Sequence, residues 1–292
     1  MHKFSIIIAS WNRRQELVNS IEKLERQAFK DFEVIVVDNG SEDGTAGLIG
    51  SNYPRVKLVR SEINLGSDAY NVGFKYADGQ YIIFMDNDAF FKEDALERAD
   101  YFFKVKKADI LAFNVIDINN GVSETGPLEK DACFFHGAAV AIERHIIEKL
   151  GGYDSRYFIM HTDLELSTRY LNNGYKILYD KDTIAFHSRS SRSRLGKEAL
   201  FYSSRNALFY YWTYYPFPYA LLLSVRELFY GLSRSFKEKA FFSFFNGFLK
   251  GAVSIPFLKK RTIADHELYL RMKLYLDSYL REPVIKKLMS NG

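Results

Sequence analysis

A chain of 292 residues, 47% of them hydrophobic, can bury one large core or one core with an appended helical region. Its single cysteine, Cys133, excludes an internal disulfide and a metal centre built from several cysteines. The apolar run at residues 4–9 is too short for a secretory signal and leads into a polar turn. We therefore expect a cytoplasmic protein.

The net charge of +4 is unevenly distributed along the chain. Residues 189–292 contain 18 Lys and Arg against 7 Asp and Glu, so the first 188 residues are acidic overall. An acidic first part and a basic second part indicate two separate tasks. The basic part has a charge suited to nucleic acid or to an anionic membrane surface.

The first part of the chain alternates short apolar runs with helical patterns. Apolar spacings of three and four residues predict helices over 13–27, 66–77 and 93–104, with a short helix from Asp43. Buried strands are predicted at 4–9, 32–37, 56–59, 81–85 and 109–116. Strands that are apolar on both faces and alternate with helices are typical of a mostly parallel sheet covered on both sides. The fold class is therefore α/β.

The pattern weakens from residue 117. Residues 117–131 lack periodicity and predict a loop or hairpin. Helices are predicted at 144–150 and 162–172, and strands at 176–179 and 184–187. We expect a catalytic domain over residues 1–194 and a helical region over 195–292.

The C-terminal region is aromatic and basic. Residues 201–257 hold 19 of the 47 aromatic residues, and residues 206–225 lack charge but are interrupted by Pro216 and Pro218. Tyr and Trp prefer the boundary between membrane and water. This composition favours amphipathic helices that lie on the membrane surface rather than a helix that spans the membrane. A helical subdomain packed on the sheet, or a homodimer interface, is the alternative.

The strand at 81–85 ends abruptly in Asp86-Asn87-Asp88. Ligands of open α/β sheets bind beyond the carboxyl ends of strands. Two acids at that edge suit Mg²⁺ or Mn²⁺ holding a phosphorylated ligand. The alternative is a polar strand end, with Asp88 capping the next helix.

Two further strand ends carry polar or aromatic groups. The first strand leads into Trp11, and the second ends at Asp38. Because consecutive strands are usually neighbours, both side chains are expected at one sheet edge, where a ring and a carboxylate could bind a nucleobase. A turn at 38–40 and a core position for Trp11 are the alternatives.

Four segments together resemble the family 2 glycosyltransferases with the glycosyltransferase A fold, a mostly parallel Rossmann-like sheet flanked by helices. They are residues 5–13 (SIIIASWNR), 34–45 (VIVVDNGSEDGT), 64–66 (NLG) and 82–88 (IIFMDND). The resemblance covers roughly residues 3–190. The resemblance implies an inverting, metal-dependent glycosyl transfer, in which the nucleobase of the donor is bound at Asp38 and Trp11.

The resemblance also implies the sites for nucleotide and metal. His187, at the end of the strand 184–187, would complete the metal site with Asp86 and Asp88. The nucleotide-binding residues would be Ala9, Ser10, Trp11, Asn12, Asp38, Asn39, Gly66, Asn71, Asp86 and Asn87. Tyr70 stands where the family often has an Arg that contacts the donor phosphate.

The helix predicted from Thr162 carries the acids Asp163 and Glu165. In the family the general base lies at the position of Asp163, although Thr162 replaces the usual Glu. Thr162 and Glu165 also form the pattern of a capping box, which would occupy Glu165 and leave Asp163 free. The helix N-terminus would then favour the ionised form of Asp163. A carboxylate that only offsets the helix dipole is the alternative.

Further residues are assigned to the acceptor and the diphosphate. His136, Gly137 and His161 are expected near the acceptor, with core packing as the alternative for the first two. Arg189, Arg192 and Arg194 lie in a Ser-rich segment that could close over the donor diphosphate, contact lipid phosphates or be an unordered loop.

The combined expectation is an inverting glycosyltransferase of cell-surface polysaccharide synthesis, with Mn²⁺ or Mg²⁺ as cofactor. It would move a sugar from a UDP- or dTDP-sugar to a hydroxyl of a glycan or lipid-linked acceptor. Its partners would be a membrane surface on the inner face of the cell membrane and a second copy of the chain, but no nucleic acid. The alternatives are a catalytically impaired nucleotide-sugar binding protein and, less favoured, a sugar nucleotidyltransferase. The latter would need a glycine-rich basic loop where residues 9–12 stand.

Overall fold

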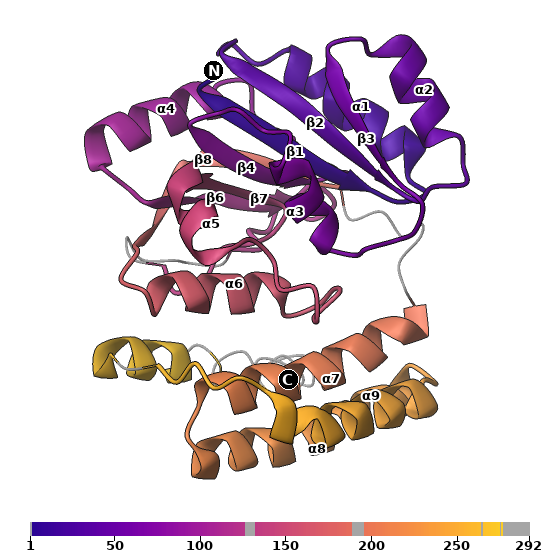
Figure 1. Cartoon of the computed structure of the whole chain (residues 1–292), viewed down its shortest axis with the longest axis vertical. Helices are drawn as coiled ribbons and strands as arrows, with labels where there is room; N and C mark the ends of the chain where they lie inside the picture. The colour runs from indigo at the N-terminus through magenta and orange to yellow at the C-terminus, as the bar shows by residue number, and fades with distance from the viewer. Residues whose placement is uncertain (1, 126–131, 189–195, 264, 275, 277–292) are drawn as a thin grey trace.

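The computed structural model describes residues 2–125, 132–188, 196–263, 265–274 and 276. Within them, eight strands form one sheet in the order β3-β2-β1-β4-β7-β6-β8-β5 (Figure 1). The strands are β1 (Phe4–Ser10), β2 (Phe32–Asn39), β3 (Val56–Ser61), β4 (Tyr81–Asp86), β5 (Ala89–Phe91), β6 (Ile110–Asp117), β7 (Ala139–Glu143) and β8 (Ile177–His187).

The half of the sheet from β3 to β4 is parallel, as the sequence predicts. In its register Ser10 of β1 lies opposite Asp38 of β2, and Ala9 of β1 lies opposite Asp86 of β4. The carboxyl ends of three strands therefore meet at one edge. This confirms the expectation that the ends of β1 and β2 are neighbours.

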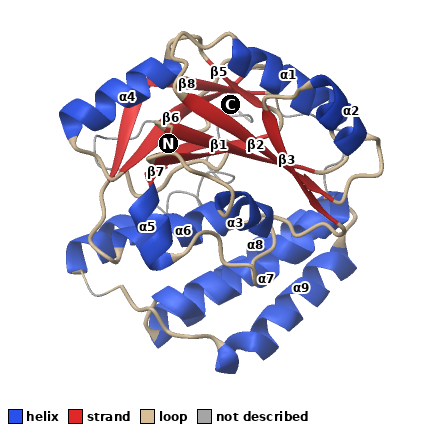
Figure 2. Ribbon diagram, turned by 45° about the horizontal axis from the view of Figure 1, so that its top comes forward, coloured by secondary structure: helices blue, strands red, loops and turns tan. Residues whose placement is uncertain are grey.

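Helices cover both faces of the sheet (Figure 2). Side chains of α1 (Arg14–Glu25), α2 (Thr45–Asn52) and α4 (Ala95–Lys106) pack on the face that carries Ile6 and Ile8. Side chains of α3 (Asp68–Phe74), α5 (Arg144–Leu150) and α6 (Thr162–Leu171) pack on the face that carries Ile7. Successive strand residues point to opposite faces, so an unbroken apolar run such as β1 serves both cores.

The second half of the sheet departs from the predicted elements. The strand predictions at 176–179 and 184–187 are one strand, β8, which is irregular in register opposite Phe113 and Asn114 of β6. Strand β7, which runs antiparallel between β4 and β6, was not predicted. Nor was the three-residue strand β5 that follows Asp88, so Asp88 does not cap a helix. Helix α4 begins after Asp94 instead.

The described part of the C-terminal region contains the helices α7 (Gly196–Tyr214), α8 (Phe217–Lys237) and α9 (Phe241–Ser254), the short 3₁₀ helix η1 (Ile255–Phe257), and a further helical stretch at residues 266–274. Helix α6 lies between the sheet and α7 (Figure 1). Its Leu166 and Tyr170 belong to the core on the sheet, and its Leu164 belongs to a second core shared with α7. None of the helices in the described part of the chain is long and apolar enough to cross a bilayer.

Candidate active site

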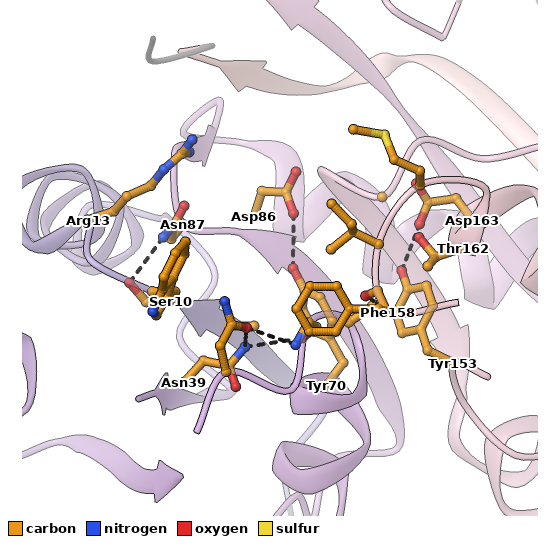
Figure 3. A pocket seen from close by; sticks show the side chains of 18 residues that line it. Ser10, Arg13, Asn39, Tyr70, Asp86, Asn87, Tyr153, Phe158, Thr162 and Asp163 are labelled. Atoms are coloured by element: carbon orange, nitrogen blue, oxygen red, sulfur yellow. Dashed lines mark hydrogen bonds between the residues drawn. The ribbon is translucent and has the colours of Figure 1, made fainter. Parts of the chain in front are cut away.

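A cavity of about 320 Å³ opens at the carboxyl ends of β1, β2 and β4 (Figure 3). Its far wall is the segment that leads into α6, together with the side chain of Asp163. The cavity falls within the size range of small-molecule sites. The sequence-predicted residues that line it are Ala9, Ser10, Trp11, Asn39, Gly66, Asp86, Asn87, Gly137 and Asp163.

Three residues predicted to bind the nucleotide do not line this cavity. Asp38 is buried at the end of β2, where its Oδ1 accepts the N–H of Ser41 at 3.2 Å. Asn12 binds the backbone N–H of Glu42 through Oδ1. Asn71 uses its side-chain amide to hold the backbone of Tyr153, donating to the carbonyl and accepting from the N–H. In this structure all three hold loops that surround the cavity.

Asn39 and Gly66 form the cavity wall beside β2. Asn39 Nδ2 donates to Asn64 Oδ1 at 2.9 Å, and Asn39 Oδ1 accepts the N–H of Leu65. Gly66 has a φ of +60°, and a Cβ there would lie 2.3 Å from the carbonyl oxygen of Phe158. Glycine is therefore required at this turn, because the opposite wall lies directly against it.

Asp163 lies in the first turn of α6, but the expected capping box is absent. His161, with a φ of 59°, is the N-cap residue, and it makes no side-chain cap. Glu165 instead bonds Arg169 one turn later, at 2.9 Å, and also accepts from Tyr214 and Arg261. Charged partners hold Glu165 more strongly than a backbone N–H would. The spacing of Thr162 and Glu165 therefore predicted a capping box that does not form. Glu165 still has a structural role.

Two tyrosines hold the two acids of the cavity (Figure 3). Tyr153 donates its hydroxyl to Asp163 Oδ1 at 3.0 Å, and the hydroxyl of Tyr70 lies 3.0 Å from Asp86 Oδ1. Their rings pack together with centroids 5.3 Å apart. Burial raises the pKa of both tyrosines well above its usual value, so both remain neutral donors. Tyr70, which departs from the family pattern, thus positions Asp86.

The pKa of Asp163 is raised to about 7, contrary to the expectation that the helix terminus would favour the charged form. Burial is the main cause and the nearby charge of Asp86 adds to it, while hydrogen bonds from Tyr153, Gly137 and Thr162 oppose the shift. These two effects outweigh the helix dipole. A carboxylate with a pKa near neutral pH is suited to accept a proton.

Asp86, Asp88 and His187 meet beside the cavity, each with one ligand atom within 4.8 Å of the others. His187 Nε2 lies 3.1 Å from Asp88 Oδ1 and 3.9 Å from Asp86 Oδ2. Arg13 Nη1 holds the other oxygen of Asp88 at 2.5 Å. Burial alone would raise the pKa of Asp88, but His187 and Arg13 lower it to about 2. Two carboxylates and an imidazole form a suitable donor set for Mn²⁺, and Mg²⁺ is also acceptable.

Glu124, which the sequence did not single out, stands behind His187. Its Oε2 lies 2.8 Å from His187 Nδ1 and 3.2 Å from His136 Nε2. His136 therefore joins this cluster rather than the cavity, where it was expected to contact the acceptor. Burial lowers the pKa of His187, but its contacts with Asp88 and Glu124 outweigh burial and raise it to about 10.

The wall in front of Asp163 has an unusual backbone. Phe158, Met160 and His161 have φ values of 63°, 60° and 59°, in the left-handed region that such residues rarely adopt. The side chain of Asn206, on α7, donates to three carbonyls of this loop, and Ser67 donates to the Phe158 carbonyl. A backbone held in this way is a common feature of functional sites.

The remaining predicted residues lie elsewhere. His161 lines a second cavity, which Asp163 also borders on its α7 side. Burial lowers the pKa of His161 to about 4, so its imidazole is neutral at pH 7. Arg189, Arg192 and Arg194 lie outside the described residues.

The sheet topology and this edge cavity define a glycosyltransferase A type of fold and site. The family described as glycosyl transferase family 2 matches residues 5–193, so the chain belongs to this family. The resemblance to this family that the sequence motifs indicated is therefore confirmed.

Two curated relatives show how far the sequence similarity extends. One relative is a poly(ribitol-phosphate) beta-N-acetylglucosaminyltransferase, TarS of Staphylococcus aureus. It is 30% identical to this chain over a stretch that makes up 41% of this chain but only 22% of TarS, so the chain spans about a fifth of that relative. The putative glycosyltransferase EpsE of Bacillus subtilis is 26% identical over 72% of this chain and 81% of its own length.

Two solved structures share the fold. Residues 1–349 of Staphylococcus aureus TarS in complex with UDP-GlcNAc superpose with a TM-score of 0.64 at 18% identity, covering 88% of this chain and 84% of that one. The mannosyltransferase PcManGT of Pyrobaculum calidifontis, in complex with GDP-Man and Mn²⁺, superposes with a TM-score of 0.60 at 16% identity. The latter covers 97% of this chain and 81% of that one.

Proposed function

We propose that this protein is an inverting glycosyltransferase of cell-surface polysaccharide synthesis, which moves a sugar from a UDP- or dTDP-sugar to a hydroxyl of a glycan or lipid-linked acceptor. The observation that carries the proposal is the cavity in which Asp163 faces Asp86 and the ends of three strands. The proposal is also supported by relatives named for polysaccharide synthesis. One of them is the amylovoran biosynthesis glycosyltransferase AmsB of Erwinia amylovora, which is 34% identical over 32% of this chain.

The donor nucleotide would occupy the part of the cavity formed by β1 and β2. Trp11 offers a flat ring for the nucleobase, while Asn39 and Gly66 form a rigid wall. Asp38 lies buried at the neighbouring strand end, and it would need a rearrangement at Ser41 to reach the base. The sugar and its diphosphate would then extend toward Asp86.

Asp163 would act as the general base. As the acceptor oxygen attacks the anomeric carbon, its proton passes to Asp163, and the bond from that carbon to the diphosphate oxygen breaks on the opposite face. Tyr153 and the Gly137 backbone hold the carboxyl group in place for this step. A single displacement of this kind inverts the configuration and needs no second carboxylic acid to protonate the leaving group.

Asp86, Asp88 and His187 would hold a divalent cation, for which their two oxygens and one imidazole nitrogen are a suitable set. When bound, the cation would offset the negative charge that develops on the departing diphosphate. Tyr70 keeps Asp86 turned toward the cavity, and Arg13 fixes the orientation of Asp88. Both contacts leave one oxygen of each carboxylate on the His187 side.

A screen of UDP- and dTDP-sugars for hydrolysis in the presence of Mn²⁺ tests this function. The wild-type protein should hydrolyse one donor slowly, and chelation by EDTA should stop the reaction. Asp163→Asn should bind the same nucleotide, measured by isothermal titration calorimetry, without turning it over. If the wild-type protein binds a nucleotide sugar but neither hydrolyses nor transfers it, it is an impaired binding protein instead.

The outer face of the C-terminal helices supports membrane association as part of this function. Large apolar side chains are exposed along α8, α9 and η1: Phe217, Leu221, Leu222, Val225, Phe229, Phe236, Phe242, Phe245, Leu249, Val253 and Phe257. Along α8 and α9 most of them recur every three or four residues, which places them on one stripe of each helix. Exposed Lys237, Lys239, Lys250, Lys259 and Lys260 lie in and next to these elements. Exposed apolar stripes together with exposed lysines in the same region match an anionic bilayer surface.

Flotation of the full-length protein with phosphatidylglycerol vesicles tests this part of the proposal. The intact chain is used because removing α7 would expose Leu164 and the rest of the shared core. Phe229→Ser with Phe242→Ser should reduce flotation, whereas Tyr101→Ser, at a similarly exposed ring on α4, should not. Equal flotation of both variants, or a dimer that these two substitutions dissociate, would contradict membrane binding.

A further inference from the structure

Glu124 belongs to the segment that folds back along β6. Its backbone N–H donates to the carbonyl of Val115 at 2.7 Å, and the neighbouring Ser123 forms a bridge with Ile116. The Glu124 side chain is only 5% exposed. This segment therefore holds a buried carboxylate beside the end of β8, where His187 stands.

The contacts of Glu124 determine where the protons of two histidines lie. His136 Nδ1 accepts the backbone N–H of Ala138 at 3.1 Å, so neutral His136 carries its proton on Nε2. That proton points to Glu124 Oε2, 3.2 Å away. The same oxygen lies 2.8 Å from His187 Nδ1, and a carboxylate oxygen there accepts a hydrogen bond from the Nδ1–H group.

His187 is thereby set with its other nitrogen toward the two aspartates. In the neutral ring, which is the form that binds a cation, the proton on Nδ1 stays bound to Glu124 and the lone pair of Nε2 is directed at the space bordered by Asp88 Oδ1 and Asp86 Oδ2. A carboxylate behind a metal-binding histidine fixes its tautomer and ring orientation and makes it a stronger ligand. Glu124 stands in that place.

We propose that Glu124 is a positioning residue for the divalent cation, acting through His187, and that His136 holds Glu124 in place. The inference rests on the proposed metal site at Asp86, Asp88 and His187. Glu124 would not touch the cation itself. The rings of His136 and His187 approach at 5.7 Å and 61°, so both imidazoles pack around one carboxylate.

Titration with Mn²⁺ alone, followed by the electron paramagnetic resonance signal of free Mn²⁺, measures this role without turnover. Glu124→Ala should weaken Mn²⁺ binding by about 10- to 100-fold. Glu124→Gln preserves the shape and should weaken it less, because an amide can accept one of the two N–H groups but carries no charge. The control is Glu143→Ala, which removes a carboxylate 2.9 Å from the ring of His145, a pair on the surface. This control should bind Mn²⁺ like the wild-type protein.

The possible failures can be told apart. If the wild-type protein binds no Mn²⁺, the proposed metal site is wrong, and this inference falls with it. If the wild-type protein binds Mn²⁺ and both Glu124 variants bind it equally well, only the role of Glu124 is wrong. Long-range ¹⁵N spectra of labelled histidine in the Mg²⁺-bound protein add a second measurement. His187 should be protonated at Nδ1 in the wild-type protein and should lose that preference in Glu124→Ala.

Discussion

The carboxylate of Asp163 lies against the backbone of Gly137, so that a Cβ added at Gly137 would stand 2.5 Å from Asp163 Oδ1. The Gly137 backbone also donates a hydrogen bond that lowers the pKa of Asp163. The sequence placed Gly137 near the acceptor, with core packing as the alternative. The contact gives a different reason for the glycine, because any larger residue would displace the proposed base.

Gly137→Ala should therefore impair the chemical step more than nucleotide binding. The added methyl group would push the Asp163 carboxylate away from its bond with Tyr153, and we expect kcat to fall by about 10- to 100-fold. Steady-state kinetics and calorimetry with UDP would separate the two effects. Gly47→Ala, where a Cβ meets nothing within 4 Å, is the control and should be fully active. An active Gly137→Ala with unchanged kcat would show that the contact does not position the base.

Asp163→Asn should lower activity and raise stability at neutral pH. Loss of a general base costs about 100- to 10,000-fold in kcat. The pKa of Asp163 is about 7 in the folded protein, against an ordinary value of 3.8. The folded state thus holds the proton more tightly, and the corresponding stability is lost as the pH rises from about 4 to 7.

The asparagine variant has no such loss. The melting temperature of Asp163→Asn relative to the wild-type protein should rise between pH 5 and pH 7 and level off above pH 7. Because Asp163 is only partly shielded from solvent, the difference in the free energy of unfolding between the two proteins should grow by about 1–2 kcal/mol over that interval. Thermal unfolding at several pH values across this range, in EDTA, measures it. A constant difference across the range would contradict the raised pKa.

In Tyr153→Phe, the acid side of the pH profile of kcat should move to higher pH. The Tyr153 hydroxyl lowers the pKa of Asp163, in opposition to burial and Asp86. Without that hydroxyl the carboxylate is protonated at higher pH, by about one unit. Tyr76→Phe, at an exposed tyrosine on the same domain, should leave the profile unchanged. A parallel loss of kcat at every pH would indicate displacement of Asp163 rather than a change in its pKa.

The parts of the site that are predictable from sequence are those marked by a break in a local pattern. Asp38 and Asp86 stand at the ends of apolar runs, and those runs alone locate the carboxyl edge of the sheet. The resemblance to the family then implies the roles of Asp163 and His187. Each of these predictions depends on a few neighbouring residues in the chain.

The parts that the sequence does not reveal depend on contacts between distant segments. Glu124 meets His187 across 63 residues, through a segment without periodicity. Tyr153 reaches Asp163 from an irregular loop, and Arg261, the second arginine that Glu165 binds, is 96 residues away. The capping-box prediction failed because Glu165 pairs with two arginines, Arg169 one turn later in the same helix and Arg261 from the C-terminal region, and not with a backbone N–H.

Asn206→Ala should loosen the wall of the active site from the C-terminal region. Asn206 is fully buried on α7 and donates to the carbonyls of Tyr157, Ile159 and Met160, where the backbone is strained. Without the amide, buried carbonyls lose their partner at a cost of about 1–3 kcal/mol, and the left-handed residues can relax.

Hydrogen–deuterium exchange of residues 157–161 should therefore become faster in this variant, and the KM for the donor should rise because Ile159 and Met160 line its cavity. Lys197→Ala, at an exposed position near the start of the same helix, should change neither. Unchanged exchange in Asn206→Ala would mean that Ser67 and Arg205, which also bind this segment, hold the loop without it. The C-terminal helices would then influence the membrane contact but not the shape of the donor cavity.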